Sequence, residues 1–176
     1  MNPNPNKDVT AQLDEFKNKY KSKKPSFFES KATNKMERAK EITTQIPLDQ
    51  LLSNTFFIID NSNKIYLDYP KLKLFATPNI YDQMLEHVTK LIQICVNIFG
   101  NVELHANLNT FSITAANRYK ELIQKLCTHF FQSDSLYKNE ITHIYLHNYP
   151  KIIPLLTSLF SGFVDDNSYD KIVLVQ

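Results

Sequence analysis

From Thr55 to Val175 the sequence alternates between segments typical of strands and segments typical of helices. Two β-rich segments, 55–60 and 64–68, are separated by the turn Asn61-Ser62-Asn63 and predict a hairpin. Predicted helices and strands then follow in turn, with crossovers of about 30 residues, which favour parallel pairing in one sheet with right-handed connections. The sequence therefore predicts an α/β fold: a mixed, mostly parallel sheet with an N-terminal hairpin and crossover helices.

The helix between Thr77 and Gly100 has the clearest signal. Its apolar residues recur at helical spacing, Pro78 stands at the first helical position, and Gly100 stands where a C-terminal glycine is common. The same periodicity arguments predict helices over 34–44, 113–131 and 150–160, and strands over 102–108, 141–147 and 171–175. Gly162 is expected to end the last helix.

Composition excludes several classes of protein. With Gly100 and Gly162 as its only glycines, the chain cannot contain a glycine-rich phosphate loop. Its two cysteines, Cys95 and Cys127, cannot build a disulfide framework or a Cys-rich zinc site, and are expected to be buried, inert thiols. No window reaches the ~20 apolar residues of a spanning helix, and the N-terminus lacks the apolar region of a secretory signal. We expect a cytoplasmic protein, with a peripheral membrane or a virion as the alternatives.

Charge is unevenly distributed along the chain. Residues 1–45 carry ten basic and six acidic side chains, whereas the remainder carries ten and twelve. We interpret 1–45 as a basic, partly disordered leader with a short helix, and 46–176 as the α/β domain. A solvated leader is the simplest interpretation. The functional alternative is contact with an anionic surface through the most basic stretch: Lys17, Lys19, Lys21, Lys23 and Lys24.

Polar side chains alternate with apolar ones on two of the predicted strands. If those strands pair, one face of the sheet gathers a carboxylate, three imidazoles, an amide and a phenol, and we predict that it contacts a ligand or a partner. Because a lipid pocket should be walled by apolar side chains, this polar face argues against a fully formed lipid pocket. A zinc site and a His–Glu acid–base pair are less favoured alternatives. The residues of this face are Glu103, His105, Asn107, His143, Tyr145 and His147.

The last third of the sequence resembles CRAL-TRIO lipid-binding domains. Residues 137–150, YKNEITHIYLHNYP, resemble the family's Tyr-containing loop and the strand that ends in Asn-x-Pro. Segments 152–160, 163–166 and 171–173 then stand where the family has a helix, a phenylalanine-rich turn and a Lys-Ile strand. The similarity covers about residues 55–176. It implies a non-enzymatic lipid-binding or membrane-associated module, without a cofactor, a metal or catalytic residues.

Two departures from the family leave an alternative open. The family's domain normally continues beyond the Lys-Ile strand, with helices that include a gate over the lipid pocket, whereas this sequence ends at Gln176. The family's domain also follows a four-helix module, where this sequence has the basic leader. Because the family's pocket residues come largely from the part beyond the Lys-Ile strand, no pocket residue is carried over. The alternative function is a reduced CRAL-TRIO-like fold that serves as a protein-interaction or structural component, such as a minor virion protein of a large DNA virus. The STAS fold is the competing resemblance. The partners considered are a phosphoinositide or other lipid, a membrane surface and a protein, whereas nucleic acid is disfavoured.

Overall fold

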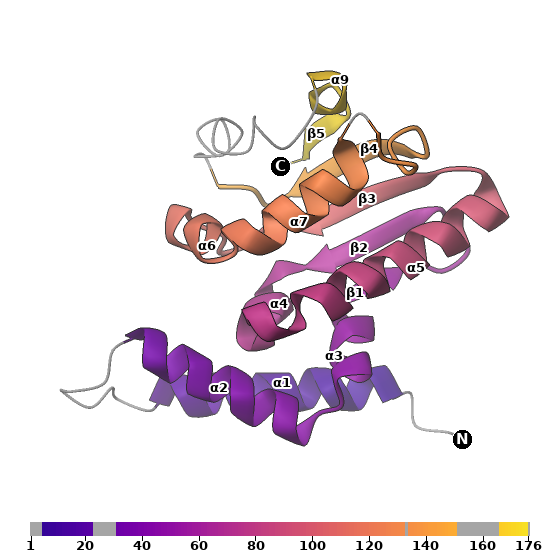
Figure 1. Cartoon of the computed structure of the whole chain (residues 1–176). Coiled ribbons are helices and arrows are strands. Elements are labelled where there is room, and N and C mark those ends of the chain that lie inside the picture. Colours follow the sequence, from indigo (N-terminus) through magenta and orange to yellow (C-terminus); the bar gives the residue numbers. More distant parts are fainter. Residues whose placement is uncertain (1–4, 23–30, 133, 151–165, 176) are drawn as a thin grey trace.

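The computed structural model describes residues 5–22, 31–132, 134–150 and 166–175, without the side chains of 5–8, 21–22, 31–33 and 166–167. These residues form a mixed five-stranded sheet in the order β1-β2-β3-β4-β5 (Figure 1). The predicted hairpin is confirmed: β1 (Phe56–Ile58) pairs antiparallel with β2 (Lys64–Asp68). The parallel strands β3 (Val102–Asn107), β4 (Ile141–His147) and β5 (Ile172–Val175) follow, each beside its predecessor. The predicted α/β fold class is correct.

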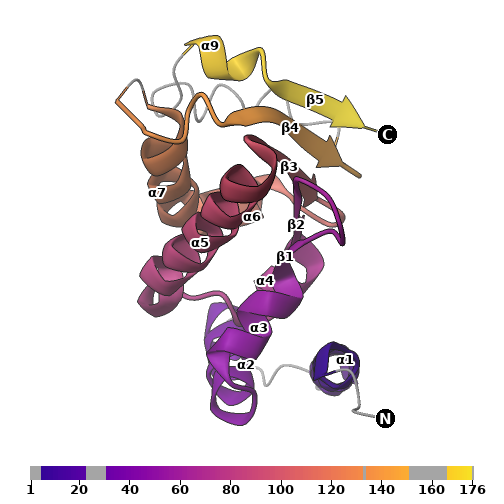
Figure 2. The same cartoon turned by 90° about the vertical axis from the view of Figure 1, so that its right-hand side faces the viewer.

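Three crossover helices lie on one side of this sheet (Figure 2). A 3-10 turn, η1 (Pro78–Ile80), leads into α5 (Tyr81–Phe99), which ends at Gly100 with a left-handed φ of 79°. The predicted helix over 113–131 is instead two helices, α6 (Ile113–Arg118) and α7 (Lys120–Phe131). They divide at Tyr119, whose ψ of 15° is not helical. Apart from Pro150, which is not helical, the predicted helix over 150–160 and the turn over 163–165 lie outside the described residues.

The N-terminal region differs from the expected leader with one short helix. It forms α1 (Pro5–Ser22) and α2 (Lys31–Gln45), and then α3 (Leu48–Thr55) after Pro47. Val9, Leu13 and Phe16 of α1 are buried in the same core as the helices that follow. Their spacing of four and three residues places them on one helical face, an amphipathic pattern that the surrounding lysines obscure in the sequence. The first helix is thus part of the folded core.

One hydrophobic core joins the helices to the sheet. The buried side of α5 contributes Met84, Ile92 and Cys95, each fully buried, and the sheet contributes Val102 and Ile141. Cys95 is therefore the buried thiol that the sequence predicts. A short helix, α4 (Tyr69–Phe75), follows β2 directly and packs against α2. Within the described residues, no helix has the length and apolar character needed to cross a membrane.

Candidate functional site

The structure brings the six predicted polar residues together on one face of the sheet. The parallel register of β3 and β4 pairs Glu103 with His143, His105 with Tyr145, and Asn107 with His147. Because alternate residues of a strand point to the same side, all six share the face opposite α5, α6 and α7. The predicted convergence of these residues is found, while their contact with a ligand or a partner stays a prediction.

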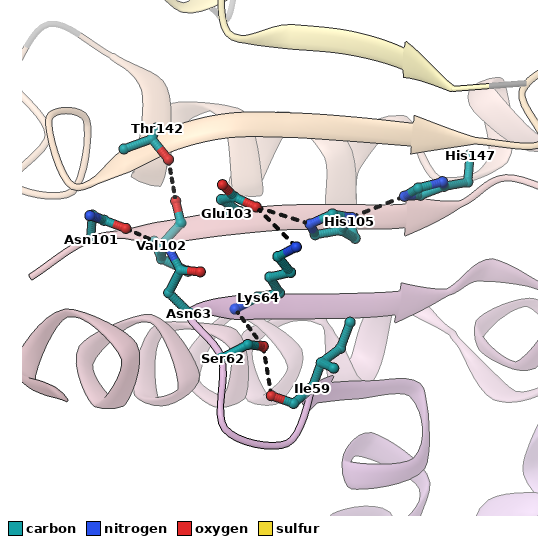
Figure 3. Close-up of polar contacts among 10 residues, drawn as sticks. All are labelled: Ile59, Ser62, Asn63, Lys64, Asn101, Val102, Glu103, His105, Thr142 and His147. Atoms are coloured by element: carbon teal, nitrogen blue, oxygen red, sulfur yellow. Dashed lines mark hydrogen bonds and ion pairs between the residues drawn. The ribbon is translucent and has the colours of Figure 1, made fainter. Parts of the chain in front are cut away.

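His105 stands at the centre of this polar face (Figure 3). Its Nδ1 lies 3.0 Å from Nε2 of His147, and its Nε2 lies 3.4 Å from Oε2 of Glu103. Its ring stacks on Tyr145 with the centroids 4.5 Å apart and the planes 15° apart. Lys64 of β2 approaches the same carboxylate at 3.9 Å. The face is therefore a connected set of rings and charges rather than a row of separate side chains.

Burial favours the neutral form of His105. Its side chain is 12% exposed, and this burial lowers the pKa of the imidazole below the usual value. The hydrogen bond that Glu103 accepts from the ring opposes this effect, whereas the charges of His147 and Lys64 add to it. A neutral ring has one donor and one acceptor nitrogen, which suits a chain of hydrogen bonds through His105. Among the described residues, no group of three or more His, Cys, Asp or Glu side chains could hold a metal ion.

A second site lies on the other side of the sheet, where the polar side chains do not reach. It is an apolar cavity of about 260 Å³. Four of the strands contribute side chains that share that face: Phe56, Leu67, Ile144, Leu146 and Ile172. Helix α7 contributes one side of its surface: Leu122, Ile123, Leu126, Cys127 and Phe131. The remaining wall comes from Tyr69, Leu72, Leu108, Phe111, Tyr119 and Tyr169.

Aromatic contacts fix one end of the cavity. Tyr69 meets Phe111 edge to face at 4.9 Å between centroids, and meets Tyr119 in the same way at 6.1 Å. Burial raises the pKa of Tyr69 to about 12, and that of the Cys127 thiol to about 11. Both groups are thus neutral at physiological pH. A cavity walled by aliphatic, aromatic and uncharged polar groups suits an apolar ligand.

Sequence reasoning identified the apolar faces of these elements but not the cavity between them. Helical spacing over 113–131 predicts that Leu122, Ile123 and Leu126 are buried, and alternation over 141–147 places Ile144 and Leu146 on one face of that strand. Periodicity shows which side of a helix or strand is buried. Whether two buried faces fill the space between them depends on side-chain packing in three dimensions, which no sequence pattern records.

The basic stretch 17–24 is described only in part. Lys17 pairs with Asp14 at 3.6 Å, and Lys19 pairs with Glu41 of α2, whose other oxygen accepts a hydrogen bond from Tyr20. The side chain of Lys21 and both Lys23 and Lys24 lie outside the described residues. Contact of this stretch with an anionic surface stays a prediction.

Comparison with known proteins supports the fold. No family model matches the sequence, and no curated protein matches it. Among solved structures, the crystal structure of Sfh5, a Sec14/CRAL-TRIO family protein, matches with a TM-score of 0.53 and 13% sequence identity. The match covers 99% of this chain and 81% of that chain. At this identity the likeness shows the fold alone, which is CRAL-TRIO-like.

Proposed function

We propose that this protein is a non-enzymatic module that binds the apolar part of a lipid or lipid-like molecule. The observation that carries the proposal is the cavity of about 260 Å³ between α7 and the apolar face of the sheet. A hydrophobic molecule that replaces water against apolar walls is bound favourably, and a cavity of about 150 Å³ with apolar walls binds benzene in another protein. The CRAL-TRIO-like fold supports the same function.

The volume limits the ligand. Pockets that bury drug-sized molecules measure roughly 300–1,000 Å³, and the cavity is slightly smaller than this range. A single acyl chain or a small apolar molecule therefore fits better than a phospholipid with two chains.

We further propose that the protein acts in the cytoplasm. Fractionation of cells that express the protein tests this location.

Co-purification of a ligand is the first test. Native mass spectrometry and organic extraction of the purified full chain should show a bound hydrophobic molecule. If the protein is purified empty, it should instead take up an added dansylated fatty acid. Leu126→Trp should reduce uptake, because Leu126 lines the cavity and the indole occupies more of it. Ile98→Trp is the matched control, since Ile98 is 68% exposed on α5. Absence of both a co-purified molecule and probe uptake would refute the proposal.

The polar face supports a second candidate function, a protein-interaction role of the fold. His143 is exposed, and its ring lies 5.7 Å from Tyr145, centroid to centroid. Aromatic and hydrogen-bonding groups of this kind suit a polar protein surface. This function is favoured if the purified protein binds no hydrophobic molecule and His143→Ala and Tyr145→Ala abolish binding to an isolated partner, while cavity variants bind it normally.

A further inference from the structure

A pocket with four basic side chains lies between the N-terminal helices and the α6 segment. Lys35 and Arg38 come from α2, Lys73 from α4 and Arg118 from α6. The pocket measures about 290 Å³. Because α2 packs against α4, residues that lie far apart in the sequence reach the same depression.

Three hydroxyl groups also line the pocket. Thr110, Ser112 and Thr114 all belong to the segment that leads into and begins α6. Lys73 donates a hydrogen bond through Nζ to Thr110, and so joins the two sides of the pocket. No Asp or Glu is among the described residues that line it. Four cations and three hydroxyls without a carboxylate make a site that attracts anions.

Within the described residues, the contacts of Arg38 leave part of its guanidinium unused. Its Nη2 donates to the carbonyl oxygen of Lys73 at 3.1 Å, while its buried Nε has no hydrogen-bond partner among the described residues. Burial lowers the pKa of Arg38, and the charge of Arg118 lowers it further. Neither arginine forms an ion pair with a carboxylate within the described part of the chain. A guanidinium has five N–H donors, so Arg38 retains donors for an anion.

We propose that this pocket binds a phosphate ester through Lys35, Arg38, Lys73 and Arg118. Arginine forks and lysine ammonium groups match the oxygens of a phosphate dianion, which accepts several charge-assisted hydrogen bonds at once. At about 290 Å³ the pocket is about ten times the roughly 30 Å³ that one water occupies in the liquid. It therefore holds the phosphate together with part of the organic group that the phosphate esterifies.

The basic pocket and the apolar cavity are neighbours, because Tyr69 lines both. The phosphate ester can thus be the headgroup of a lipid or a soluble molecule, and the chemistry of recognition is the same for both. The proposal does not depend on the apolar cavity: its anion test gives an answer even if no hydrophobic molecule binds there.

Binding of a soluble anion tests the site directly. Glycerol 3-phosphate, titrated into the full chain by isothermal calorimetry and thermal-shift measurements, should bind and raise the melting temperature, and glycerol should do neither. Added salt should weaken the binding. Lys35→Gln and Arg118→Gln should each weaken it about tenfold, because each removes a charge-assisted contact. Both side chains are exposed, so these substitutions leave the core intact.

Matched controls separate the pocket from general surface charge. Lys40→Gln makes the same charge change as Lys35→Gln on an exposed position of α2, outside the pocket. Lys120→Gln is the corresponding control near Arg118, at an exposed position of α7. The proposal is wrong if the controls weaken binding as much as the pocket variants do. It is equally wrong if neither glycerol 3-phosphate nor the vesicles described next bind.

Vesicles identify the source of the phosphate. Phosphatidylcholine vesicles that contain phosphatidic acid present a phosphate monoester, and vesicles with phosphatidylserine present negative charge without one. Binding of the first kind alone, lost in Lys35→Gln and Arg118→Gln, supports a lipid headgroup. Binding of glycerol 3-phosphate with no vesicle binding supports a soluble ester. Equal binding of both vesicle kinds, unchanged in the two variants, contradicts the pocket as the site.

Discussion

His105 and His147 share a hydrogen bond across neighbouring parallel strands, with Nδ1 of one ring 3.0 Å from Nε2 of the other. The bond needs one ring nitrogen that donates and one that accepts, so at least one of the two rings in it is neutral. The lowered pKa of His105 agrees with this requirement. The polar face therefore has an electrostatic state that depends on pH.

Stability should fall as the pH falls below about 6.5, the ordinary value for histidine. Because the pKa of His105 is lowered in the folded protein, the unfolded chain takes up its proton first. The unfolded state then binds more protons, which reduces the free energy of unfolding until His105 is also protonated in the folded state. Urea titrations at pH 7, 6 and 5 measure this dependence. His105→Gln should make it shallower, whereas His143→Gln, at an exposed position, tests whether any histidine has the same effect.

The core position of α1 predicts a large effect of Leu13→Ala. Leu13 is 2% exposed, and loss of its buried side chain should cost about 2–5 kcal/mol of unfolding free energy. Glu15→Ala, on the exposed side of the same helix, should cost little. Chemical denaturation of both variants makes the comparison. Wild-type stability of Leu13→Ala would mean that α1 does not contribute to the core.

Gly100→Ala should destabilise the protein by about 1 kcal/mol through the backbone alone. Gly100 has a φ of 79°, and a Cβ added there would meet no atom within 4 Å. A loss far above this size would show that a side chain at this position clashes after all. Gly100→Asn should cost less, because asparagine tolerates the left-handed region better than alanine does. Thermal unfolding of the two variants measures the difference.

Cys127 should report on occupancy of the apolar cavity. Burial raises its pKa to about 11, so alkylation by iodoacetamide should be slow at pH 7 and should accelerate as the pH rises towards 11, because the thiolate fraction increases. A bound fatty acid should slow the reaction further, because the thiol lines the cavity. Cys95→Ala leaves Cys127 as the single native thiol. A cysteine introduced by Ile98→Cys at an exposed position should react quickly, with or without ligand.

Most secondary structure could be predicted from the sequence, because periodicity and end signals are local. Gly100 correctly marked the end of α5, and the alternation of polar and apolar residues correctly predicted β3 and β4. Helix α1 was missed, since Val9, Leu13 and Phe16 are separated by charged and polar residues. The division at Tyr119 was also missed, because the same apolar pattern continues through it.

Sites that depend on distant residues were harder to predict. The polar face could be found because its residues alternate on two strands that the fold class makes neighbours. The basic pocket could not, since Lys35, Arg38, Lys73 and Arg118 lie on three helices and form no cluster in the sequence. The run of lysines over 17–24 gave a stronger local signal. The proximity of the four pocket residues arises only from the packing of α2 on α4 and from the position of α6.

The spatial order of the strands equals their order in the sequence. During synthesis, each of these strands can therefore pair with the strand made just before it, which lies at the edge of the growing sheet. None of the five has to insert between two strands that have already paired. Assembly can advance in the direction of translation, and β5 joins β4 last. A ribosome stalled before that strand would present a nascent chain with an open β4 edge, which is available for pairing with other chains.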